Sequence, residues 1–306
     1  MAIAMLEREP SGCERMLAPT TDRLARIHRA QVHRDPWPEF ERFDPTPWPA
    51  EQRRAAAVQW AGRARAEHGS IQQFSGVTHV LATACVELEL LGSLARLITD
   101  EVRHAELCAA MALAVWPEGP ALEPKVFAWP RPREPWRAAP RFEDDQTNDR
   151  AEPQRAWAAS ALLTACCLGE TLSRPMLDAL VVVTTDPIAE AVSQQIRRDE
   201  HLHAAFGWDG LAHLLPQLGP SSRAALQRQL AHDFAGFERS VCRGIGIEQM
   251  AGRALTIERG QPNLGVLTDE QYAMIFFATL EGEIFPQLRG LGLDPERAWA
   301  ERADAG

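Results

Sequence analysis

The hydrophobic positions of the chain recur at helical spacing over most of its length. In residues 51–84 the apolar side chains repeat every three or four positions and share one face of a helix. That face carries Trp60, Ala64, Glu67, Ile71, Phe74 and Val77 or Thr78. The apolar-polar alternation that is typical of β-strands is nearly absent from the sequence. The pattern therefore predicts an all-α fold.

Proline and glycine residues separate the helical segments. After the first helix, further helices are expected at 86–116, 154–184 and 187–215, with one more in each of the segments 219–246 and 267–292. Each boundary carries residues that end or begin helices, such as Thr-Thr-Asp-Pro before the fourth helix. The predicted helices are thus long, and residues that break helices separate them.

The helical pattern divides the chain into three parts. Residues 1–50 are rich in X-Pro steps and are expected to form an irregular N-terminal arm containing tryptophan and proline. Residues 51–216 are expected to form the main helical domain, in which the segment 117–153 has no convincing period and is expected to be a long crossover or a functional cover. Residues 217–306 are expected to form a helical extension that packs on this domain.

Composition narrows the class of protein. The net charge of −10 argues against a broad nucleic-acid-binding surface. No apolar run approaches the roughly 20 residues that a membrane span needs, and the N-terminus lacks the apolar core of a signal peptide. The six cysteines form no Cys-x-x-Cys pair and are expected to be reduced and mostly buried. Together these features favour a cytoplasmic protein that binds neither nucleic acid nor membranes.

The short sequence Asp-Glu-x-x-His occurs twice. Glu101 and His104 follow Asp100, and Glu200 and His203 follow Asp199. With 27 Glu and 9 His in the chain, about one Glu-x-x-His is expected by chance, but two copies that both follow Asp are expected roughly once in a thousand. Residues three apart project from one helical face, so each motif presents a carboxylate and an imidazole together.

Each motif has a Glu at the matching height of the preceding helix. Residues equally distant from the turn of a helical hairpin lie at the same level, and a turn near Ala84–Cys85 places Glu67 opposite Glu101. Glu67 is the only acidic residue between Gln52 and Ala84. The first motif is therefore expected to share its level with a third ligand.

The second motif follows the same rule. Asp186 and Pro187 are expected to begin a helix as N-cap and first-turn residue. A turn there places Glu170 opposite Glu200. The six predicted ligands are Glu67, Glu101, His104, Glu170, Glu200 and His203.

Four carboxylates and two neutral imidazoles balance the charge of two divalent cations. Oxygen-rich ligation with some imidazole favours iron or manganese. A metal-bound His usually donates its second N–H to a carboxylate, and Asp100 and Asp199 are expected to hold the histidine of the partner helix in this way. Arg103 is expected to bridge to one of these aspartates, although solvated helix charges remain an alternative for all three residues.

Other residues near the motifs have ordinary explanations. Cys166 and Cys167 precede Glu170 by about one turn and are expected to fill the core rather than to bind metal as thiolates. His68 and His201 each follow a ligand directly and point about 100° away from it, so both are expected outside the site.

The two Asp-Glu-x-x-His motifs, together with Glu67 and Glu170, resemble the ligand pattern of the ferritin-like superfamily of diiron-carboxylate proteins. The resemblance covers about residues 50–216. The resemblance implies a four-helix bundle with a long crossover, and two irons bridged by Glu101 and Glu200 with Glu67 and Glu170 as terminal ligands. It also implies O2 or peroxide as co-substrate. The chain departs from members that carry a Cys-rich rubredoxin module, and its only tyrosine, Tyr272, lies far from the motifs.

The expected activity is that of a non-haem dinuclear-iron oxidase or oxygenase. Its partners would be O2, a small organic or peptide-derived substrate and an electron donor, and the protein would be a monomer or homodimer. Two alternatives stay open, namely a metal-handling ferroxidase without an organic substrate and a dimanganese, catalase-like enzyme. The motifs do not distinguish iron from manganese or a mixed centre, nor hydroxylation from N-oxidation, desaturation or C–C cleavage.

Overall fold

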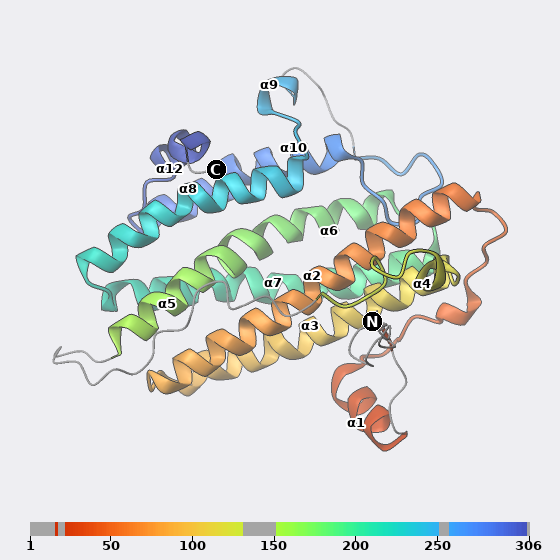
Figure 1. Ribbon diagram of the computed structural model, residues 1–306, viewed down its shortest axis with the longest axis horizontal. Helices are drawn as coiled ribbons and strands as arrows, with labels where there is room; N and C mark the ends of the chain where they lie inside the picture. The colour runs from red at the N-terminus through yellow and green to blue at the C-terminus, as the bar shows by residue number, and fades with distance from the viewer. Residues whose placement is uncertain (1–15, 18–21, 131–150, 251–256, 305–306) are drawn as a thin grey trace, which may run out of the picture. The chain divides into compact units, whose positions relative to one another are not determined.

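The computed structural model describes residues 16–17, 22–130, 151–250 and 257–304, and the fold is drawn in Figure 1. Over these ranges every regular element is a helix and none is a strand, so the expected all-α class is confirmed. The chain divides into two compact units. Unit 1 contains Met1–Gln72 and Thr99–Arg133, and unit 2 contains Gln73–Ile98 and Glu134–Gly306.

Unit 1 contains α1 and the larger parts of two long helices. Its elements are α1 (Asp22–Val32), η2 (Phe40–Arg42), most of α2 (Ala50–Thr83), the second half of α3 (Leu88–Val115) and α4 (Gly119–Leu122). The two long helices match the predicted helices 51–84 and 86–116. Of the predicted crossover, residues 131–150 lie outside the described part of the chain.

The expectation of an irregular N-terminal arm was wrong for residues 22–32, which form α1. The helix has Asp22 in its first turn and Arg29 in its last, which is the charge order that the helix dipole favours. Its only buried residue is Val32, while Leu24 and Ile27 are more than half exposed. The X-Pro steps that predicted an irregular arm lie before and after residues 22–32, and no proline falls within them.

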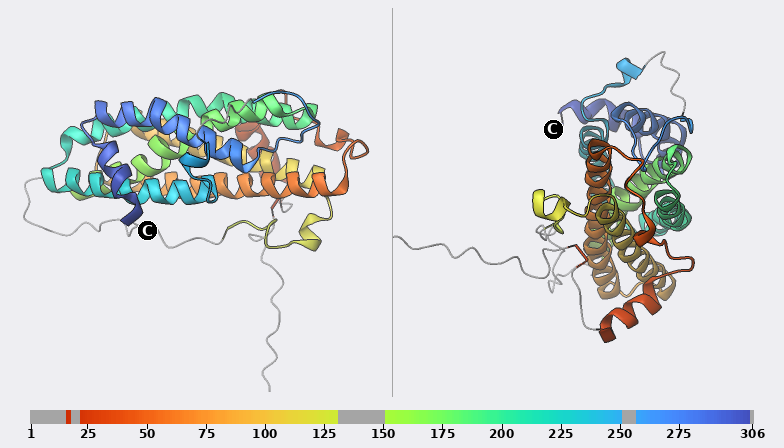
Figure 2. Two further views of the ribbon diagram at one scale, coloured as in Figure 1. Left: turned by 90° about the horizontal axis from the view of Figure 1, so that it is seen from above. Right: turned by 90° about the vertical axis from the view of Figure 1, so that its right-hand side faces the viewer.

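Unit 2 contains the remaining helices. They are α5 (Glu152–Leu162), η3 (Leu163–Glu170), α6 (Thr171–Val183), α7 (Pro187–Leu214), η4 (Leu215–Gln217), α8 (Pro220–Cys242), α9 (Ile247–Met250), α10 (Asp269–Thr279), η5 (Leu280–Ile284), α11 (Phe285–Gly290), α12 (Pro295–Glu301) and η6 (Arg302–Asp304). The helix α8 lies against α10 and α12 (Figures 1 and 2), and α10 also contacts α6. The C-terminal helices thus pack with α5, α6 and α7 in one unit.

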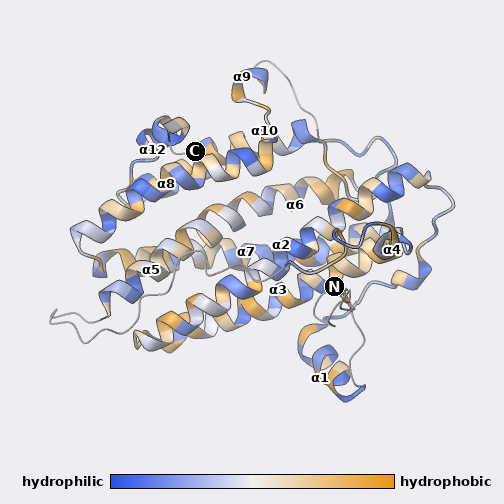
Figure 3. Cartoon of the chain, in the orientation of Figure 1, coloured by the Kyte–Doolittle hydropathy of each residue, from blue (hydrophilic) through white to orange (hydrophobic). Residues whose placement is uncertain are grey.

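The core of unit 2 is aliphatic near α5 and aromatic near the C-terminus. Leu162 and Leu163 are fully buried, and Phe234, Phe276 and Trp299 form a ring cluster with centroids 5.7–6.3 Å apart. Burying each such side chain contributes roughly 1.5–3 kcal/mol. The helices carry hydrophobic and hydrophilic residues side by side (Figure 3). Among the described residues no helix is long and apolar enough to cross a membrane.

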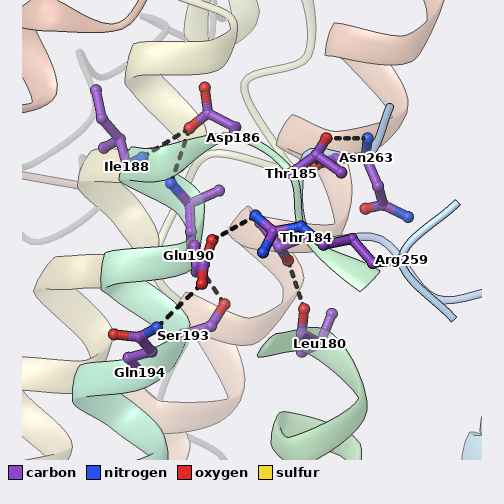
Figure 4. A network of polar contacts seen from close by, with 11 residues as sticks. Leu180, Thr184, Thr185, Asp186, Ile188, Glu190, Ser193, Gln194, Arg259 and Asn263 are labelled. Carbon is purple, nitrogen blue, oxygen red and sulfur yellow. Dashed lines mark hydrogen bonds and ion pairs between the residues drawn. The ribbon is translucent and has the colours of Figure 1, made fainter. Parts of the chain in front are cut away.

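The turn between α6 and α7 confirms the predicted N-cap. The Asp186 side chain accepts a hydrogen bond from the N–H of Ile188 at 3.0 Å (Figure 4) and another from the N–H of Ala189 at 2.9 Å. Pro187 begins the helix. The N–H of Thr185 donates to the carbonyl of Asn263 at 2.9 Å, and the N–H of Asn263 donates to the Thr185 hydroxyl at 2.8 Å. This exchange ties the turn to the segment before α10.

The predicted helix 154–184 is not regular. Residues Leu163–Glu170 form a π-helical segment, η3, between α5 and α6. Gly169 has a low helix propensity, and Pro175, inside α6, has no N–H for the helix ladder. Both residues weaken a continuous α-helix, and π-helical turns of this kind occur frequently at functional sites.

Candidate metal centre

In unit 1, the structure brings Glu67 of α2 and His104 of α3 together. The Nδ1 atom of His104 lies 3.9 Å from Oε2 of Glu67. His104 and Glu101 are fully buried, and the Glu67 side chain is 17% exposed. Because α3 is a continuous helix, Glu101 and His104 lie three residues apart on one side of it. Unit 1 thus holds three of the predicted ligands.

In unit 2, the other three predicted ligands form one cluster. One ligand atom from each of Glu170, Glu200 and His203 lies within 4.8 Å of the others, and all three residues are buried. The Nδ1 atom of His203 is 3.7 Å from Oε2 of Glu200 on the same helix, α7. Asp199 is also buried, and Nη2 of Arg96 lies 3.6 Å from its Oδ1 atom.

The π-helical segment η3 carries Glu170 at its last position. A π turn contains one more residue than an α turn, so it rotates every following side chain relative to a regular helix. The same segment lies close to α7, because a Cβ atom on Gly207 would meet the Cβ atom of Cys166 at 2.4 Å. The absence of a side chain at Gly207 therefore lets the element that carries Glu170 approach the helix that carries Glu200 and His203.

A buried polar network joins η3 to α8. The Thr164 hydroxyl donates to Oδ2 of Asp233 at 2.7 Å and accepts from Nε2 of Gln229 at 2.7 Å. The amide of Gln229 also donates to the Ser160 carbonyl, and the Ser160 hydroxyl donates back to Oε1 of Gln229 at 2.5 Å. Such a network satisfies polar groups that would be costly to bury alone. It holds the π-helical segment at its N-terminal end.

Asp100 and Arg103 form a buried ion pair in unit 1. Nη1 of Arg103 donates to Oδ1 of Asp100 at 2.7 Å, which is the contact expected between Arg103 and one of the two aspartates. Nε of Arg103 donates to the carbonyl of Val32 at 2.5 Å, and Nη2 of Arg34 lies 3.3 Å from the same Asp100 oxygen. The pair therefore connects α3 to the end of α1.

The donor sets fit a metal ion. The two Nδ1–Oε2 distances, 3.9 Å and 3.7 Å, are shorter than the sum of two metal-ligand bonds of about 2.0–2.2 Å, so one cation can bind both atoms of a pair. Carboxylates and imidazoles are suitable ligands for iron and manganese. Two buried carboxylates as near as Glu170 and Glu200 repel each other unless a cation or a proton offsets their charge.

Neighbouring residues behave as expected from the sequence. The His68 ring stacks on Trp129 with centroids 4.7 Å apart, and burial lowers the pKa of His68, which favours the neutral ring. Cys166 and Cys167 are buried, and burial raises the pKa of the Cys167 thiol well above its usual value. A neutral thiol is consistent with core filling, and Cys108 and Cys242 are buried as well.

No family model, curated protein or solved structure matches the chain. The observations that bear on its function are therefore these two sets of residues.

Proposed function

We propose that the protein is a non-haem dinuclear-iron oxidase or oxygenase of the ferritin-like type, acting with O2 on a small organic or peptide-derived substrate. In this proposal the four helices of the bundle are α2, α3, α7 and the continuous helical segment made of α5, η3 and α6. The observation that carries the proposal is the repetition of one donor set, a buried Glu-x-x-His with an added Glu, in the two units.

Each set supports the proposal by itself. Glu101 and His104 are fully buried on α3, and so are Glu200 and His203 on α7. Charged side chains are rarely buried on a helix unless they pair with an opposite charge or bind a metal ion. Two motifs that both place an acid and an imidazole at 0% exposure are therefore better explained by ligation than by chance.

Two bound irons would supply electrons for the reduction of O2. An external donor would then return the irons to the ferrous state. The four carboxylates would balance the charge of two divalent cations, and the two neutral imidazoles would complete the ligand set. The ion pair of Asp100 with Arg103 would keep α3 in place while metal binds to Glu101 and His104. The apolar core of unit 2 near Glu170 would exclude bulk water from that side.

The first experiment is metal analysis of the purified protein by inductively coupled plasma spectrometry. The expected result is about two irons per chain, in line with six ligands of this type. The double variant Glu101→Ala, Glu200→Ala should lose both. After anaerobic loading with Fe²⁺, exposure to O2 should change the absorbance of the wild-type protein and leave that of the double variant unchanged.

A matched pair of histidine variants separates ligation from general damage. His203 is fully buried, whereas His201, two residues earlier on the same helix, is exposed. We expect His203→Ala to lose metal and His201→Ala to keep it. Absence of metal from the wild-type protein after reconstitution would refute the proposal. Manganese in place of iron would favour the dimanganese, peroxide-consuming alternative, and O2-dependent iron oxidation with no organic turnover would favour the metal-handling one.

A further inference from the structure

Three side chains outside these two sets converge on one point in unit 1. Nε2 of His28 lies 2.6 Å from Oε2 of Glu106, and Nε2 of His33 lies 2.9 Å from the same oxygen. His28 is on α1, His33 directly follows it, and Glu106 is on α3. One ligand atom from each residue lies within 4.8 Å of the others. No sequence motif indicated this cluster, because 73 residues separate His33 from Glu106.

The two imidazoles are held in fixed orientations. The His33 ring stacks parallel to Trp37, with centroids 3.6 Å apart and an interplanar angle of 1°. The His28 ring meets the His33 ring edge-on at 5.5 Å. The side chains of His28, His33 and Glu106 are 37%, 18% and 23% exposed. A cation can therefore enter from solvent and keep a water molecule as a further ligand.

We propose that His28, His33 and Glu106 bind a divalent transition-metal ion of the zinc class. Two imidazoles and one carboxylate form a three-ligand set that leaves a fourth position for water. Zinc-ligand bonds of about 2.0–2.1 Å at tetrahedral angles put ligand atoms roughly 3.3 Å apart. The two nitrogen-oxygen distances must therefore open by about half an ångström, which partly exposed side chains can provide.

The site is separate from the set that contains His104. Glu106 follows His104 by two residues, which turns its side chain about 200° around the helix axis. The proposal therefore does not depend on the function proposed above. A metal here would fasten α1 to α3.

That fastening matters because α1, in the described part of the chain, buries little apolar surface. Val32 is the only buried residue of α1, and its carbonyl accepts a hydrogen bond from Arg103. Leu24 and Ile27 are exposed and contribute little apolar burial. A metal that joins residues 78 positions apart restricts the chain as a cross-link does. The docking of α1 should then depend on the metal.

The binding experiment uses the full chain after treatment with a chelator, with Zn²⁺ as the probe and a chromophoric chelator as competitor. The titration is made in the Glu101→Ala, Glu200→Ala background, so that the candidate dinuclear centre does not contribute. We expect one Zn²⁺ per chain. His33→Ala or Glu106→Gln should weaken binding at least tenfold. The control is His213→Ala, which removes the single histidine of the His213–Glu87 pair (3.1 Å) and should leave the affinity unchanged.

Limited proteolysis provides a second readout in the wild-type chain. Arg23, Arg26 and Arg29 lie exposed on α1 and are sites for trypsin. Zn²⁺ should slow cleavage at these three residues, a chelator should reverse the effect, and His33→Ala should abolish it. Equal Zn²⁺ affinity with and without His33→Ala in the Glu101→Ala, Glu200→Ala background, or cleavage of the wild-type chain that does not respond to Zn²⁺, would overturn the proposal and leave the cluster as a hydrogen-bonded contact. Iron loading at His203 is measured separately, so failure of one proposal is not failure of the other.

Discussion

Gly207 of α7 lies so close to Cys166 of η3 that a Cβ atom at Gly207 would be 2.4 Å from the Cβ atom of Cys166. The backbone carbon of Cys166 and the nitrogen of Cys167 would lie 2.8 Å and 3.0 Å away. Backbone atoms cannot rotate aside as the end of a long side chain can. Contact between the π-helical segment and α7 therefore depends on glycine at position 207.

The variant Gly207→Ala should be destabilised by about 1–3 kcal/mol, because overpacking outweighs the better helix propensity of alanine. Chemical denaturation measures the loss. If the proposed metal centre is correct, the variant should also bind less iron, since η3 carries Glu170.

The control for this substitution is Gly236→Ala in α8. A Cβ atom at Gly236 would meet nothing within 4 Å, so the substitution should raise the free energy of unfolding by up to about 1 kcal/mol. Equal stability of the Gly207→Ala variant and the wild-type protein would show that η3 and α7 do not pack as described.

Replacement of Arg103 by methionine should be severe. It removes the donor to the Val32 carbonyl and a cation whose Nη1 atom lies 2.7 Å from the buried carboxylate of Asp100. Breaking a buried ion pair from one side costs about 3–5 kcal/mol. Arg34→Met removes a cation whose Nη2 atom lies 3.3 Å from Oδ1 of Asp100 and whose side chain is 41% exposed. This substitution should lower the free energy of unfolding by less than about 1 kcal/mol. Denaturation midpoints for the two variants test the difference, and similar losses would contradict it.

The Thr164 hydroxyl should be essential to the network between η3 and α8. Thr164→Val removes one hydrogen bond to the buried carboxylate of Asp233 and one acceptor of the Gln229 amide, although that amide still donates to the Ser160 carbonyl and to Oδ2 of Asp233. We expect a loss of about 1–3 kcal/mol. Thr164→Ser keeps the hydroxyl and should stay within about 1 kcal/mol of the wild-type protein. A serine variant as unstable as the valine variant would assign the effect to the methyl group instead.

The N-cap Asp186 should make stability depend on pH. Burial raises its pKa above the usual value, although hydrogen bonds from the N–H groups of Ala189 and Ile188 act in the opposite direction. An acid whose pKa is raised in the folded state stabilises the fold fully below its unfolded pKa of about 3.9 and loses that contribution as the pH rises through the folded pKa.

Asparagine caps helices as well as aspartate does and has no proton to lose in this range. We therefore expect Asp186→Asn to match the wild-type protein at low pH and to gain relative stability as the pH rises above about 4. Asp186→Ala should be about 1 kcal/mol less stable than Asp186→Asn at any pH, because neither variant titrates at this position and only the alanine variant lacks the cap. Unfolding free energies measured across pH would contradict this account if wild-type and asparagine proteins showed the same slope.

Local sequence was enough to define most of the helices. Asp186 and Pro187 began α7 as expected, since a cap and an X-Pro step act on their own backbone. The all-α class followed from apolar periodicity in the same way. The spacing Glu-x-x-His also decides, within one helix, that Glu200 and His203 lie on the same side. These features need no information from distant residues.

Only the tertiary structure shows the features that depend on contacts between distant segments, such as the packing of η3 and the position of α1. The π-helical segment that carries Glu170 lies against Gly207 and is tied to Gln229, and neither partner is near it in sequence. The helix α1 buries only Val32, so its place depends on groups of α3 such as Glu106. Periodicity records which face of a helix is buried, but not which residue of another helix meets it. The meeting of His28 and His33 with Glu106 therefore became visible only in the folded chain.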